Sequence, residues 1–150
     1  MSAMAGLILG ESSIRFEDTV TGEKTCVSYL TDTNLDGVFD EKDLEVNHDL
    51  TSAVLTSENT FSSANAMASV LSDAGIVMLG KRSGGGSCAL QYNSTADGWF
   101  YSISGSIHLI NAAGEDIDSG VPVKEGLMKE GEEKDYSVYY DFDRIRSCLK

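Results

Sequence analysis

Two adjacent serines, Ser62 and Ser63, stand where a short apolar segment meets a helical pattern. The next apolar segment leads into a glycine run, Gly84, Gly85 and Gly86. In a parallel β-α-β unit, the start of the helix and the end of the following strand lie at the same edge of the sheet, so we expect the serines and glycines to border one crevice. A hydroxyl at a helix start, beside backbone that a substrate can approach closely, suits acyl-transfer chemistry.

Both features also have simpler interpretations. A serine at the start of a helix is more often a capping residue than a nucleophile, and a glycine run is often only a flexible turn. A phosphate-binding loop is a poor match for residues 75–82, GIVMLGKR, because the residues between the glycines form an apolar strand rather than a flexible loop. A catalytic crevice and a structural turn therefore remain the alternatives.

A second candidate site is the acidic segment 32–43, DTNLDGVFDEKD. Oxygen-bearing residues fall at positions 1, 3, 5, 9 and 12 and glycine at position 6, the spacing of an EF-hand-type calcium loop. The candidate ligands are the side chains of Asp32, Asn34, Asp36, Asp40 and Asp43 and the carbonyl of Val38. Position 12 is Asp rather than Glu, and in this the segment resembles the loops of dockerin-type modules. Calcium would have a structural role; the alternative is an acidic turn whose side chains cap the backbone.

The spacing of apolar residues predicts the elements that position these candidates. The expected strands are 13–16, 25–30, 53–56, 76–79, 88–92, 99–104 and 107–110, and the expected helices are 63–74 and 136–149, while residues 3–9 could form either. Gly105 is expected to separate the last two strands. The sequence thus predicts a layered α/β domain with a β-α-β unit, additional strands and a C-terminal helix, rather than a sandwich or a bundle.

The composition limits the partners. At 150 residues the chain fits a single domain, and 24 acidic against 11 basic residues give a net charge of −13. That charge repels nucleic acid and anionic lipid, and no apolar stretch is long enough for a membrane span. The cysteines, Cys26, Cys88 and Cys148, are too far apart for a zinc motif and odd in number, so we expect reduced thiols. The first residues lack the basic region of an export signal.

The segment around the serines resembles a known family. Residues 60–65, TFSSAN, followed by a helix, a strand and residues 80–90, GKRSGGGSCAL, resemble the catalytic region of tail-specific serine peptidases, also called carboxyl-terminal processing peptidases, including tricorn-related members. The resemblance covers most of residues 50–149. It implies a ClpP/crotonase-like fold and a peptide or protein substrate bound beside Gly84, Gly85 and Gly86. The nucleophile would be Ser62, with Ser63 as the adjacent alternative.

The chain also departs from the family pattern. Asn65 stands where most members have Glu, and the glycine loop lacks the lysine that many members use as the general base. Neither His48 nor His108 lies in a matching motif, and the family's preceding Asn-x-Gly-Gly motif is absent. We therefore expect residues 1–150 to be the C-terminal portion of a tail-specific peptidase catalytic domain, with residues 32–43 as an insertion and the N-terminal half as a missing partner.

Three functional alternatives follow. The chain could be a serine peptidase whose isolated form is incomplete, or a non-catalytic calcium-binding or scaffolding module that keeps the peptidase fold. It could also be a subunit that takes its general base from another chain. Members of the family usually work outside the cytoplasm, although this chain carries no export signal.

Overall fold

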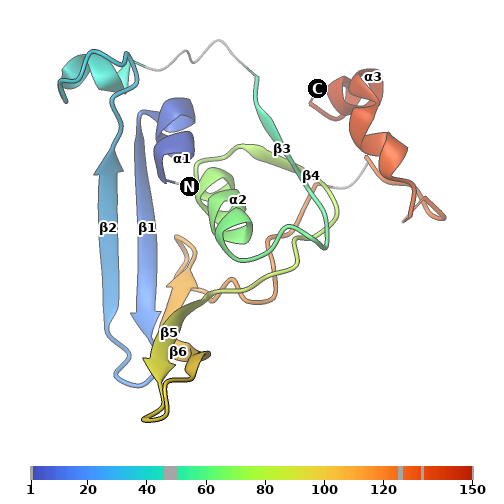
Figure 1. Ribbon diagram of the computed structural model, residues 1–150. Helices are drawn as coiled ribbons and strands as arrows, with labels where there is room; N and C mark the ends of the chain where they lie inside the picture. Colours follow the sequence, from blue (N-terminus) through green and yellow to red (C-terminus); the bar gives the residue numbers. More distant parts are fainter. Residues whose placement is uncertain (1, 46–50, 125–126, 133, 150) are drawn as a thin grey trace.

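The computed structural model describes residues 2–45, 51–124, 127–132 and 134–149. The described elements are, in chain order, α1 (Ser2–Leu9), β1 (Glu11–Asp18), β2 (Lys24–Leu30), the 3-10 helix η1 (Glu41–Leu44), β3 (Ala53–Thr56), α2 (Ser63–Asp73), β4 (Val77–Gly80), β5 (Cys88–Ser94), β6 (Phe100–Ile110), the 3-10 helix η2 (Tyr136–Tyr140) and α3 (Phe142–Cys148). Within these residues the strands form an antiparallel sheet in the order β2-β1-β6-β5 and a separate pair, β3-β4 (Figure 1).

The β3-α2-β4 segment is the expected β-α-β unit. β3 and β4 pair in parallel, with Ala53 opposite Val77 and Thr56 opposite Gly80. Parallel neighbours need a crossover, and α2 supplies it. The prediction of a parallel unit between residues 53 and 80 is therefore confirmed.

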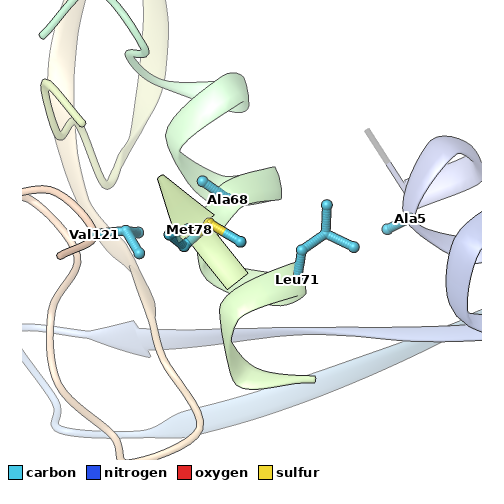
Figure 2. Close-up of a cluster of buried hydrophobic side chains, with 5 residues drawn as sticks. All are labelled: Ala5, Ala68, Leu71, Met78 and Val121. Carbon is cyan, nitrogen blue, oxygen red and sulfur yellow. The ribbon is translucent and has the colours of Figure 1, made fainter. Parts of the chain in front are cut away.

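The apolar face of α2 builds the main core. Ala68 and Leu71 are buried together with Met78 of β4, Ala5 of α1 and Val121. Figure 2 shows Met78 and Ala68 between Val121 and Leu71, with Ala5 beyond Leu71. Helical spacing places Ala68 and Leu71 on one side of α2, and their burial fixes the orientation of the helix start that carries the serines.

The last strands of the antiparallel sheet differ from the prediction. Residues 99–104 and 107–110 were expected as two strands separated by Gly105, but Phe100–Ile110 is the single strand β6. A Cβ atom at position 105 would lie 2.9 Å from the Ala89 carbonyl oxygen, next to a register shift between Cys88 and Leu90. The glycine allows the close approach of β5 at this irregularity, and it does not end the strand.

The C-terminal segment is also divided differently. Residues 136–149 were expected as one helix, whereas the structure has η2 followed by α3. Asp141 separates them: its backbone is non-helical, and its carboxylate accepts a hydrogen bond from Arg144 N at 3.0 Å. This capping makes Asp141 the start of a new helix. Val138 and Ile145 pack with Leu79 and Leu127 in a second core cluster.

The described elements make a mixed α/β domain with an antiparallel sheet, a short parallel unit and a C-terminal helix. The expected mixture of strands and helices is confirmed. None of the described helices combines the length and the apolar character needed to cross a membrane.

Candidate active site

Ser62 has an unusual backbone conformation. Its φ of 57° and ψ of −121° lie outside the regions that residues with a side chain normally adopt. Such a conformation costs on the order of 1–3 kcal/mol and persists only when the surroundings impose it. Two backbone bonds do so: Ser62 N donates to Gly85 O at 2.9 Å, and Ala66 N donates to Ser62 O at 2.9 Å. Ser62 is thus held in a strained turn immediately before α2.

The glycine run supports this turn through close backbone contacts. Phe61 and Gly85 form a parallel bridge, and Gly84 N donates to Thr60 O at 2.8 Å. A Cβ atom at position 84 would lie 2.1 Å from Glu58 O, and one at position 85 would lie 1.8 Å from Asp118 O. Side chains are therefore excluded at both positions. The expected convergence of the serine turn and the glycines is confirmed, and the glycine run is a packed segment.

The Ser62 hydroxyl does not cap the helix. Ser62 occupies the N-cap position of α2, yet its side chain makes no capping hydrogen bond and the residue is exposed. This removes the usual structural reason for a serine at a helix start. Ser63 is exposed in the first turn of α2. Because α2 has no acidic residue in its first turn, the partial positive charge of its N-terminus is available to stabilise an anion near Ser62.

Asn65 has a structural role in the site. Its side chain is fully buried; Nδ2 donates to Ile117 O at 3.0 Å, and Oδ1 accepts a hydrogen bond from Ser83 Oγ at 2.6 Å. Ser83 Oγ also accepts a hydrogen bond from Val121 N at 2.6 Å. The network ties the first turn of α2 to the glycine loop and to residues 117–121. Ser83 was not among the predicted site residues, because a polar residue before a glycine run has no distinguishing sequence signal.

A histidine cluster lies at the far end of the glycine loop. His108 Nδ1 is 2.6 Å from Asp116 Oδ2 and 3.1 Å from Ser87 Oγ, and Ser87 N donates to Asp118 Oδ1 at 3.1 Å. Burial raises the pKa of Asp116, but hydrogen bonds from Ser87 and His108 more than offset it, so this pKa lies below its usual value. The cluster joins the end of the glycine loop to residues 116–118.

This cluster does not have the geometry of a catalytic triad. In a triad the histidine uses one ring nitrogen for the hydroxyl and the other for the carboxylate. Here the hydroxyl of Ser87 and the carboxylate of Asp116 both contact Nδ1 of His108. Ser87 is also almost completely buried, which leaves no room for a substrate at its hydroxyl. We interpret the cluster as a support for the glycine loop.

The other basic side chains near the loop have their own partners. Lys81 Nζ lies 3.1 Å from Glu58 Oε1, and Arg82 Nη1 donates to Gly120 O at 2.9 Å. Among the described residues, no basic side chain is hydrogen-bonded to the Ser62 hydroxyl. His48 lies outside the described residues. The sequence left the identity of the general base open, and no basic group among the described residues is in contact with Ser62 to fill that role.

A small aromatic pocket lies at the end of β3. Its volume is about 200 Å³, and it is lined by Leu55, Thr56, Ser57, Tyr136, Tyr139 and Tyr140. Tyr139 closes one side, because its hydroxyl donates to Thr56 O at 2.8 Å. Thr60 N donates to Ser57 O at 2.8 Å, so the pocket borders the turn that leads to Ser62. A pocket of this size fits one side chain rather than a cofactor.

The acidic segment forms a tight hydrogen-bonded turn. Asp32 Oδ2 accepts a hydrogen bond from Gly37 N at 2.8 Å, Asn34 Oδ1 accepts one from Asp36 N at 2.9 Å, and Asp36 Oδ1 accepts one from Val38 N at 2.8 Å. Gly37 has a φ of 82°, as the sharp bend of a calcium loop requires. These hydrogen bonds from backbone N–H groups to acidic and amide side chains are also what an acidic turn without calcium would form.

The end of the acidic segment is anchored inside the protein. Asp43 is fully buried, and its carboxylate accepts hydrogen bonds from Asp40 N at 3.0 Å and Thr33 N at 2.8 Å. The bond from Asp40 N lowers the pKa of Asp43 and outweighs the effect of burial. Asp40 itself caps η1 by accepting from Lys42 N. No group of three or more acidic, histidine or cysteine side chains within the described ranges is placed to share a metal ion. Calcium binding stays a prediction.

Comparison with known proteins supports the fold. No known protein-family model matches this chain, and no curated protein sequence matches it. Among solved structures, the fold is similar to that of a lipoprotein from Streptococcus agalactiae, with a TM-score of 0.58 over 81% of this chain. The two sequences are 15% identical, and this chain spans 43% of the length of the lipoprotein. At this identity the similarity concerns the fold alone.

Proposed function

We propose that this chain carries the nucleophile of a serine peptidase, with Ser62 as the nucleophile on a ClpP/crotonase-like domain. The conformation of Ser62 is the observation that carries the proposal. A strained, exposed serine whose hydroxyl makes no capping bond has no evident structural purpose at that position. Strained backbone of this kind clusters at functional sites, where the surrounding structure imposes it.

The proposed chemistry is attack by Ser62 Oγ on a peptide carbonyl carbon, with transfer of the hydroxyl proton to a general base. The base then gives this proton to the leaving amine as the peptide C–N bond breaks, and water hydrolyses the acyl group from Ser62. The N-terminus of α2 would favour the developing negative charge. Since no basic side chain contacts Ser62 among the described residues, the base would come from another segment of a complete catalytic domain or from another chain. The pocket lined by Tyr136 and Tyr139 would hold one substrate side chain.

A fluorophosphonate probe tests this proposal, because it phosphonylates only activated serines. The chain combined with the segment or partner chain that supplies the general base should be labelled at Ser62, and Ser62→Ala should abolish the labelling. Ser63→Ala is the matched control and should keep it. Alanine at position 62 leaves the same backbone strain, so both variants should unfold at the temperature of the unmodified chain. Absence of labelling, or labelling that survives Ser62→Ala, contradicts the proposal.

We also propose a calcium-binding role for residues 32–43, which would hold whether or not Ser62 is catalytic. The supporting observation is the bend at Gly37, the sixth position of the segment. Its backbone N donates a hydrogen bond to Oδ2 of Asp32, the first position. The side chains of Asp32, Asn34 and Asp36 would supply ligand oxygens, and Val38 would supply its carbonyl. Calcium there would stabilise the connection between β2 and β3.

A further inference from the structure

The β5-β6 hairpin is almost free of charge. Residues 88–110 contain Asp97 as their one acidic or basic residue, apart from His108, although the chain has 24 acidic and 11 basic residues in total. The same hairpin exposes large apolar side chains: Leu90, Tyr92, Trp99, Phe100, Tyr101 and Ile103. In Figure 1 the hairpin tip lies at the opposite end of the view from α3. Few charges and many aromatic residues are typical of the core of a protein–protein interface.

β5 is also an unprotected edge strand. It stands at the end of the sheet order β2-β1-β6-β5, and among the described residues it pairs with β6 alone. Natural edge strands are usually protected by charged residues, proline or inward-facing lysine. β5, with the sequence CALQYNS, contains none of these, whereas β2 at the other edge begins with Lys24. The outer edge of β5 is therefore suited to pair with a further strand.

We propose that β5 pairs antiparallel with β5 of a second copy of the chain, across a two-fold axis at Gln91. In this register Leu90 lies opposite the partner's Tyr92, and Ala89 lies opposite the partner's Asn93. Leu90 and Tyr92 share one face of the strand, because successive side chains alternate. Within one chain they face only Ser104 and Ser102 of β6, which leaves them exposed. The second copy gives each of them an apolar neighbour.

The lack of charge along the edge of β5 favours a second copy over a strongly basic partner. A strongly basic partner would find no carboxylate along β5, whereas two copies of β5 bring together segments that carry no charge and therefore do not repel one another locally. An uncharged edge is matched best by an equally uncharged edge. The two-fold pairing brings no like charges opposite one another, because Asp97 lies in the turn outside the paired residues. The proposal does not depend on the chemistry of Ser62.

Sedimentation equilibrium of the full chain tests the pairing. The unmodified chain should form a dimer. Leu90→Lys and Tyr92→Lys should each raise the dimer dissociation constant by at least about tenfold, because the two-fold axis places each substitution in the β5–β5 interface twice. Val20→Lys, at an exposed position in the turn between β1 and β2, is the control and should leave the dimer intact. All three variants reduce the net negative charge equally, so general repulsion cannot explain a difference between them.

A crosslink locates the axis. In a chain whose native cysteines are replaced by serine, Gln91→Cys should give a disulfide-linked dimer on mild oxidation, and Val20→Cys should not. A monomer at every concentration overturns the proposal. So does a dimer that survives both lysine substitutions, or one that Gln91→Cys fails to crosslink.

Discussion

At the residue scale, two polar residues at the start of α2, Ser62 and Asn65, differ from what their positions in a helix would normally require. Ser62 stands at a cap position without capping, and Asn65, a polar residue inside a helix, is fully buried and satisfied. Buried amides of this kind are costly to disturb, because a lost partner leaves a polar group without solvent or a hydrogen bond. Asn65 and Ser83 therefore tie the first turn of α2 to the residue that precedes the glycine run and to residues 117–121.

Asn65→Asp tests this role. The change keeps the shape of the side chain but replaces the Nδ2 donor with an oxygen that faces Ile117 O. We expect the free energy of unfolding to fall by about 1–3 kcal/mol, measured by urea denaturation at neutral pH. Asn59→Asp, at an exposed position in the turn before Ser62, should change it by less than about 0.5 kcal/mol. Equal losses in the two variants would refute a special role for Asn65.

At the element scale, the acidic segment is a short connection with its own hydrogen-bonded structure. It joins β2 to η1 and is anchored by the buried carboxylate of Asp43. The bend at Gly37 is compatible both with a calcium loop and with a capped acidic turn. Metal binding would distinguish the two, because only the calcium loop is stabilised by a divalent cation.

Calcium should raise the melting temperature of the chain, and magnesium should not. Binding stabilises the folded state by mass action, and each kcal/mol corresponds to about 2–4 °C for a chain of this size. Asp36→Ala should abolish the shift, whereas Asp97→Ala, which removes an acid in the β5-β6 turn, should keep it. Identical melting curves in calcium and in chelator would exclude the site.

At the scale of the whole molecule, acid-linked stability follows from carboxylates that gain hydrogen bonds on folding. The pKa of Glu132 is lowered by the hydrogen bond from Arg144, and the pKa values of Asp18 and Asp135 are lowered by bonds to Val20 and Ser137. Asp73 is the exception, because burial raises its pKa. A carboxylate whose pKa is lower in the folded chain than in the unfolded chain stabilises the folded state at pH values above its unfolded-state pKa. This stabilisation is lost as the pH falls from the unfolded-state pKa toward the folded-state pKa.

The chain should therefore lose stability as the pH falls below the ordinary values of 4.5 for Glu132 and 3.8 for the aspartates. Urea unfolding midpoints in chelator, measured from about pH 6 to about pH 3, would show this loss. In Glu132→Gln the loss should be smaller, because the Arg144 contact no longer depends on a titrating group. Asp73→Asn should make the loss steeper, since it removes the opposing contribution. A midpoint that stays constant or rises in acid would contradict this account.

Local sequence patterns are sufficient to predict the β-α-β unit and the convergence of the serine turn with the glycines. Both follow from local periodicity and from the rule that crossover connections return to the same edge of a sheet.

The other features of the candidate site depend on the folded structure. The strain at Ser62, the network of Asn65 and Ser83, and the shared ring nitrogen of His108 depend on contacts between residues far apart in the chain. The continuity of β6 through Gly105 likewise depends on how closely β5 approaches. Such contacts form only when distant segments pack together, so no local pattern predicts them.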